Sequence, residues 1–166
     1  MNHWIKLMVC SLALWWPATV LHAHATPAES AAEDVHSVAA EMHETWDKPN
    51  QPLTLPVIVI YQGMAIADWI QDDKGGRALL KYHPAHQHWH TLLCGGSELT
   101  SSRHLEAAGM SSADAQSLAA LLQSHEQDLT DDQRQRIDSF KGVVKFSKGK
   151  PVSSTAHDMH GDTHGH

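Results

Sequence analysis

Four short β-prone segments follow one another closely, and this arrangement constrains the fold more than any other feature of the chain. The segments are rich in apolar, β-branched and aromatic residues and span 57–61, 64–71, 77–82 and 89–93. The connections between them hold only a few residues, whereas parallel strands need a long crossover, usually a helix. The sequence therefore predicts an antiparallel meander of four strands.

Helical patterns lie on both sides of these strands. Residues 34–46 place apolar side chains at helical spacing, and prolines follow directly. Residues 103–108, 112–128 and 131–140 also indicate helices. We expect a single α+β domain over residues 34–146, with an N-terminal helix, the antiparallel meander and C-terminal helices.

Two details refine this expectation. Ser112 and Asp131 are the expected N-caps of the second and third C-terminal helices, because their side chains can accept a hydrogen bond from a backbone N–H of the first turn. Residues 143–146 are rich in valine and phenylalanine and are a candidate for one more short strand.

The first 25 residues have the composition of a secretory signal peptide. Lys6 precedes an apolar run over residues 7–21, and Ala23 and Ala25 provide the small residues of a cleavage site. The run is shorter than the roughly 20 residues that cross a bilayer. We expect export to the periplasm, a mature chain without a membrane span, and a flexible lead-in over residues 26–33.

Charge and cysteine content restrict the function. The formal net charge is −7, which provides no basic surface for nucleic acid. The chain has two cysteines, and Cys10 lies in the predicted leader. Cys94 therefore has no partner for an internal disulfide, and we expect the apolar core alone to stabilise the fold.

Histidine is the residue type that indicates a function. The chain has 15 histidines against 12 lysines and arginines. An acidic surface rich in imidazole suits metal cations such as Cu(II) and Zn(II). We therefore expect a metal-binding protein.

A first group of histidines lies between the third and fourth predicted strands. It consists of His83, His86, His88 and His90. If residues 86–90 are extended, the last three share one face of the strand, and His83 approaches from across the hairpin. This spacing predicts a site of two to four imidazoles, the alternative being a solvated polar face.

A second group lies in residues 147–166, which are rich in Lys, Gly, Pro, Ser and Thr and predict a disordered metal-binding tail. Imidazole and thioether donors are interleaved there with Asp and Gly, which favours adaptable and unselective binding. The candidate ligands are His157, Met159, His160, His164 and His166.

Several other residues have a less specific pattern. Cys94 follows an apolar run and is either a buried core residue or a ligand for Cu(I) beside His90 or His104. His36, His43, His104 and His125 are spaced as surface residues. We expect Asp68 and Arg77 to form a cross-strand ion pair, and Trp69, Trp89, Leu79 and Leu80 to lie in the core.

Several short motifs together resemble one family. In chain order they are Ala65 to Trp69, Gly75 to Leu80, Trp89 with Leu93 to Gly96, Leu105 to Gly109, Ala113 to Ala115 and Phe140 to Val144. Their order and spacing resemble the small exported copper uptake system-associated proteins, over roughly residues 34–146. The histidine-rich hairpin and tail are additions to that family pattern.

The resemblance and the histidines together lead to a functional expectation. We expect a copper-binding accessory protein that captures, buffers or hands over copper, as Cu(I) or Cu(II), with zinc as the alternative metal. The resemblance implies components of a copper import system as partners. A protein-interaction or scaffold domain whose histidine tail buffers zinc or copper is the alternative, and an enzymatic role is not expected.

Overall fold

The computed structural model describes residues 27–147 and 150–152, with side chains described from residue 34 onward. The predicted signal peptide and most of the predicted tail lie outside the described residues. The strands are β1 (Ile58–Tyr61), β2 (Met64–Gln71), β3 (Lys74–His83), β4 (His88–Gly95), β5 (Val143–Ser147) and β6 (Lys150–Val152). The helices are α1 (Pro27–Trp46), α2 (Ser102–Ala107), α3 (Ser112–His125), α4 (Asp131–Ile137) and the short 3₁₀ helices η1 (Ser97–Thr100) and η2 (Glu126–Asp128).

The six strands form one antiparallel sheet in the order in which they occur along the chain. This confirms the predicted α+β class, whereas the predicted number of four strands is wrong. The expected short strand is β5, which pairs with β4 after the helical segment, and β6 then pairs with β5. Residues 147 and 150–152 therefore belong to the sheet and not to the tail.

The first hairpin has a two-residue turn with a specific backbone conformation. Gln62 has φ of 50° and Gly63 has φ of 71°. Positive φ at both central residues is typical of the tight turn whose twist matches that of two antiparallel strands. Glycine adopts this conformation without steric cost, so the Gln62-Gly63 pair ends β1 and starts β2 within two residues.

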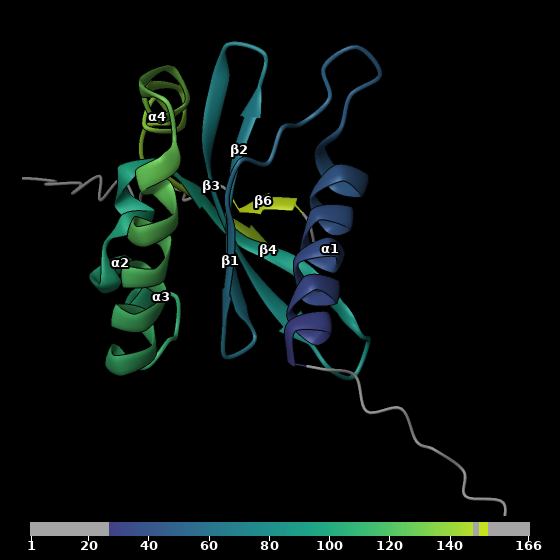
Figure 1. The fold of residues 1–166 in the computed structure, drawn as a ribbon, viewed down its shortest axis with the longest axis vertical. Helices are drawn as coiled ribbons and strands as arrows, with labels where there is room; N and C mark the ends of the chain where they lie inside the picture. Colours follow the sequence, from purple (N-terminus) through teal and green to yellow (C-terminus); the bar gives the residue numbers. More distant parts are fainter. Residues whose placement is uncertain (1–26, 148–149, 153–166) are drawn as a thin grey trace, which may run out of the picture.

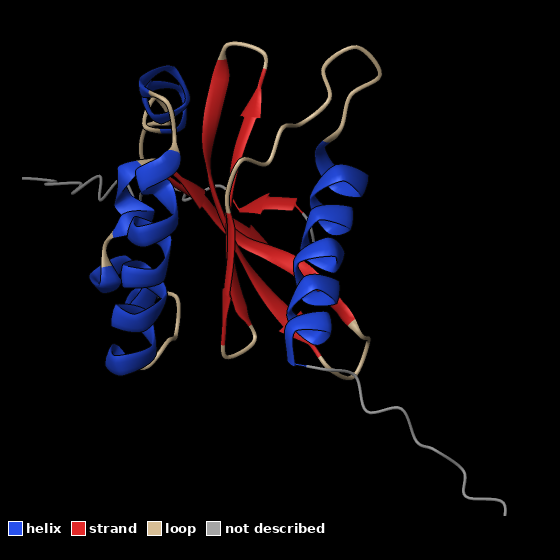
Figure 2. Ribbon diagram, viewed as in Figure 1, coloured by secondary structure: helices blue, strands red, loops and turns tan. Residues whose placement is uncertain are grey.

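Helices cover both faces of the sheet (Figures 1 and 2). On one face, α1 packs Val38 and Met42 against the strands in a cluster with Ala65, Ala67 and Leu80. On the other face, α2 and α3 supply a second cluster. It contains Ile66, Leu79, Leu93, Leu105, Leu118 and Leu122. Because side chains alternate across a strand, neighbouring residues such as Ala65 and Ile66 belong to different clusters.

The ends of the helices differ from expectation by a few residues. Helix α1 begins at Pro27, so residues 27–33 are helical and not a flexible lead-in. Proline suits a first helical turn, and the alanines and glutamates that follow it favour helix. Ser111 and Thr130 cap α3 and α4 in place of the expected Ser112 and Asp131, because the cap is the residue before the first helical one.

The described helices do not include one that is long and apolar enough to cross a membrane.

Candidate functional site

The β3–β4 hairpin carries the first histidine group at its tip. His83 ends β3 and pairs with His88, which begins β4, while Lys81 pairs with His90. Trp89 is 3% exposed on the face toward α1, whereas its neighbours His88 and His90 lie on the opposite face. Two of the three histidines predicted to share a strand face therefore do so.

His86 reaches the group through the turn and not through the strand. Gln87 has φ of 53°, so the backbone between His86 and His88 is bent and not extended as the prediction assumed. The bend brings the ring centres of His86 and His88 to 5.6 Å. This is closer than the roughly 7 Å between alternate residues of a straight strand.

The four imidazole rings, which we call the hairpin histidines, form one cluster. His83 lies diagonally across the hairpin from His90, with ring centres 4.0 Å apart and planes at 29°. The ring centres of His88 and His90 are 5.6 Å apart, and those of His83 and His86 are 6.4 Å apart. The hairpin thus brings together all four histidines that the sequence predicted as one site.

The electrostatic surroundings favour the neutral form of at least one ring. Partial burial lowers the pKa of His90, and the neighbouring His83, His88 and Lys81 lower it further because they would repel a second positive charge. A neutral imidazole has a free nitrogen lone pair, which metal binding requires. His90 is therefore deprotonated at neutral pH.

The distances between the rings suit a shared metal ion, but the rings are not yet oriented to bind one. Two imidazoles on one tetrahedral ion, with metal–nitrogen bonds of about 2 Å, have ring centres about 5 Å apart. The His86–His88 and His88–His90 pairs are near this value, whereas the His83–His90 pair is stacked. Within the described ranges, no three His, Cys, Asp or Glu side chains are already placed to hold an ion, so these rings would have to rotate.

The hairpin is anchored on its other face by aromatic packing. Trp89 and Tyr82 have ring centres 5.3 Å apart, and Trp89 Nε1 donates a hydrogen bond of 2.9 Å to Ser37 Oγ on α1. The backbone beneath the exposed histidines is therefore held by α1. Their side chains can change rotamer without disturbing the core.

Cys94 lies apart from the hairpin histidines. It packs in the cluster with Trp89 and Leu80 beneath α1. A β-bulge at Leu92 shifts the alternation of β4, so Cys94 lies on the face opposite to His88 and His90. Burial raises the pKa of its thiol to about 12, so the thiolate that a metal requires does not form near neutral pH. Of the two alternatives left by the sequence, these surroundings favour the core residue.

The remaining histidines do not join the cluster. His36, His104 and His125 are exposed on helices, and Nδ1 of His43 lies 3.0 Å from Oδ2 of Asp47, the residue that follows α1. The tail candidates His157, Met159, His160, His164 and His166 lie outside the described residues.

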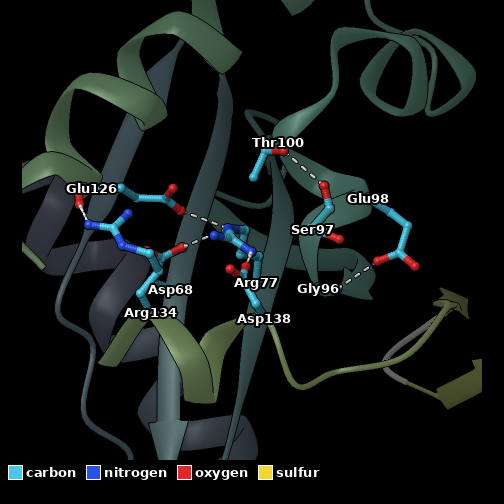
Figure 3. A network of polar contacts seen from close by, with 9 residues as sticks. All are labelled: Asp68, Arg77, Gly96, Ser97, Glu98, Thr100, Glu126, Arg134 and Asp138. Carbon is cyan, nitrogen blue, oxygen red and sulfur yellow. Dashed lines mark hydrogen bonds and ion pairs between the residues drawn. The ribbon is translucent and has the colours of Figure 1, made fainter. Parts of the chain in front are cut away.

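A second group of polar side chains lies between the sheet and the C-terminal helices, and its members Asp68, Arg77 and Glu126 are buried (Figure 3). Arg77 donates to Glu126 at 2.7 Å and to Asp138 at 2.8 Å, and its Nε lies 3.6 Å from Asp68 Oδ1. The expected ion pair between Asp68 and Arg77 is thus present, although it is the longest of the three contacts. Burial raises the pKa of Asp68 to about 8, and the nearby Glu126 carboxylate contributes to this rise.

The sequence analysis missed Glu126 and Asp138 as partners of Arg77. A signal existed for Glu126, because it continues the buried stripe of α3 formed by Leu118 and Leu122 at a spacing of four residues. A charged residue in such a stripe requires a buried partner. No comparable signal marks Asp138, whose side chain is 43% exposed.

Comparison of the chain with models of known protein families, with curated proteins and with solved structures found no match. The resemblance to copper uptake system-associated proteins stays a prediction.

Proposed function

We propose that this protein is a copper-binding accessory protein of the periplasm, which captures copper and buffers it or hands it over to an uptake system. The observation that supports the proposal is the cluster of four hairpin histidines, with ring centres between 4.0 and 6.4 Å apart. Four imidazoles without a carboxylate partner in the cluster are a set of borderline nitrogen donors. Such donors suit Cu(II) and Zn(II).

Copper is favoured over zinc for two reasons. Nitrogen sites bind Cu(II) more tightly than other divalent first-row metals, including zinc. The sequence motifs also resemble those of copper uptake system-associated proteins. The tail residues His157, Met159, His160, His164 and His166 are proposed as additional, weaker sites, because a segment whose composition predicts disorder would lose more freedom when it binds an ion.

The position of the cluster favours exchange of an ion over catalysis. His86 and His88 are exposed at the tip of a hairpin. A surface site admits water and a partner protein, whereas a reaction site usually excludes water around the reacting atoms. The proposed role is therefore delivery or storage of copper, with components of an import system as partners.

Two variants test where copper binds. Replacement of His86, His88 and His90 by Ala should weaken the tightest Cu(II) affinity by more than about tenfold, because it removes three of four nitrogen donors. Truncation after Thr155 should lower the number of bound ions and leave the tightest affinity unchanged. Calorimetric titration gives both quantities, and electron paramagnetic resonance of bound Cu(II) reports nitrogen ligands.

A matched control separates this site from a general effect of histidine number. Replacement of the dispersed His36, His104 and His125 by Ala removes the same number of imidazoles and should leave the tightest affinity unchanged. If truncation abolishes binding and the hairpin variant equals the parent, the proposal fails. The alternative, an interaction domain with a metal-buffering tail, then holds.

The identity of the metal is tested by measuring the metal content of untagged protein isolated from its own periplasm. Copper in near-stoichiometric amount is the expected result, and zinc without copper contradicts it. Because binding requires neutral imidazole, copper should also be released at acidic pH, and the lowered pKa of His90 places this release below the ordinary histidine value of 6.5.

A further inference from the structure

Strand β1 forms one edge of the sheet, and its outer side has no neighbouring strand among the described residues. The strand lies between the two helical layers (Figure 1). Ile58 and Ile60 pack with the cluster beneath α1, whereas Val59 belongs to the cluster that α2 and α3 supply. Helices therefore pack against both faces of β1, and the question is what lies along its outer edge.

The hydrogen-bond pattern identifies the backbone groups on this edge. The Asp68 N–H donates to the Val57 carbonyl oxygen at 2.9 Å, which places Val57 at a hydrogen-bonded position beside β2. Such positions alternate along an antiparallel strand, so Val59 also bonds β2, whereas the N–H and C=O groups of Ile58 and Ile60 point away from it. None of the described residues provides a backbone partner for these four outward groups.

The edge is accessible to solvent. Ile58 and Ile60 are half-buried, whereas their register partners on β2, Ala67 and Ala65, are 0% exposed on the same sheet face. Exposure on this face therefore increases from β2 to β1. Unpaired backbone groups along an accessible edge are a template for a further strand.

The two edge strands differ in the residues that discourage such pairing. Strand β6 at the opposite edge consists of Lys150, Pro151 and Val152, and lysine and proline are residues that protect edge strands. Residues 57–61 contain neither a charge nor a proline, and all of them are β-branched or aromatic. Of the two edges, β1 is therefore the one suited to pairing.

We propose that the β1 edge is an interaction surface for a second copy of this chain, with the two β1 strands antiparallel about a two-fold axis at Val59. Ile58 of each copy then faces Ile60 of the other. Each of these two pairs exchanges two backbone hydrogen bonds, which satisfies all the outward groups of both residues.

The chemistry of the strand favours its own copy as the partner. The facing isoleucines form apolar cross-strand pairs, and an uncharged strand does not repel an identical one. A two-fold contact uses the same surface on both copies and is closed, so the assembly stops at a dimer. This surface is separate from the hairpin histidines, so a chelator should leave the dimer intact.

Sedimentation equilibrium of the full exported protein, with a chelator present so that metal does not link two hairpins, should give a mass that rises with concentration toward two chains. Ile60→Pro removes one outward N–H per copy and no hydrogen bond to β2. Because two of the four bonds between the copies are lost, the dissociation constant of the dimer should rise about tenfold or more. The control Ile60→Val trims the same side chain, keeps the N–H and should dimerise like the parent protein.

Hydrogen exchange of the parent protein tests the geometry without a variant. The amides of Ile58 and Ile60 should become more protected as the protein concentration rises, whereas those of Val59 and Tyr61, which bond β2, should be protected at every concentration. A monomer at all concentrations would overturn the proposal and leave the edge to an extended segment of a different protein. Exchange at Ile58 and Ile60 that does not change with concentration, or a folded Ile60→Pro variant that dimerises like the parent protein, would overturn it as well.

Discussion

Asp68 is buried to 0% exposure, and neither of its carboxylate oxygens has a hydrogen-bond partner among the described residues. Its raised pKa of about 8, against an ordinary value of 3.8, follows mainly from burial and then from the Glu126 carboxylate, with Arg77 opposing both. Near neutral pH the Asp68 side chain is therefore largely protonated, and the charges of Arg77 and Glu126 compensate one another.

This protonation makes stability depend on pH. Between about pH 4 and 8 the folded protein holds a proton that the unfolded chain releases, so the free energy of unfolding falls as pH rises, by at most about 1.4 kcal/mol per pH unit. Asp68→Asn imitates the protonated form and should remove this slope. Urea unfolding from pH 5 to 8 measures the slope of the free energy of unfolding against pH for both proteins.

The exposed Asp132, which pairs with Arg136 at the surface, provides the control for this measurement. Asp132→Asn should keep the slope of the parent protein. Parallel pH profiles for the parent protein and Asp68→Asn would show that Asp68 is ionised in the fold.

Gly76 allows a close contact that a side chain would prevent. A Cβ atom at this position would lie 2.9 Å from Cζ2 of Trp69, its register partner on β2. Gly76→Ala should therefore displace the indole and lower the free energy of unfolding by about 1–3 kcal/mol, as overpacking does. A shifted Trp69 fluorescence spectrum and a lower urea midpoint are the expected results, and an unchanged spectrum contradicts them.

At the scale of elements, Arg77 joins three parts of the fold. It lies on β3, and its guanidinium bonds Glu126 in η2 and Asp138 at the end of α4. Arg134 on α4 adds a hydrogen bond of 2.9 Å to the Glu126 carbonyl oxygen (Figure 3). The short helix α4 is thus attached to the sheet by these polar contacts in addition to its buried Ile137.

Removal of the guanidinium should release this attachment. Arg77→Met leaves the buried Glu126 carboxylate without its charge partner, and we expect a loss of about 3–5 kcal/mol in the free energy of unfolding. Hydrogen exchange should accelerate first at the amides of α4. Arg103→Met on the exposed surface of α2 is the control and should cost less than about 0.5 kcal/mol.

At the scale of the whole molecule, the fold does not depend on the hairpin histidines. Two apolar clusters lie on opposite faces of the sheet, and the rings of His86 and His88 belong to neither. Protein freed of metal by a chelator should therefore keep one cooperative thermal transition, which differential scanning calorimetry detects.

Added Cu(II) should then raise the melting temperature of the parent protein but not that of the variant with His86, His88 and His90 replaced by Ala, because only a ligand bound to the folded state stabilises it. Loss of the cooperative transition after chelation would instead identify the metal as part of the fold.

Local information in the sequence predicted the strands and the class of fold. The alternation around Ile66 and the Gln62-Gly63 turn depend only on neighbouring residues, so β1 to β4 and the α+β class followed from them. The joining of β5 and β6 to the sheet did not follow from neighbouring residues. Strand β5 pairs with Leu93 and Cys94 of β4 across about fifty residues of helix and loop.

The same division applies to the candidate sites. The density of histidines around the β3–β4 turn identified all four hairpin histidines from the sequence, since a tight turn brings the end of one strand beside the start of the next. The tertiary structure alone decided the burial of Cys94 beneath α1 and the meeting of Asp68 and Arg77 with Glu126 and Asp138. Each of these depends on packing between segments far apart in the chain, which local pattern does not encode.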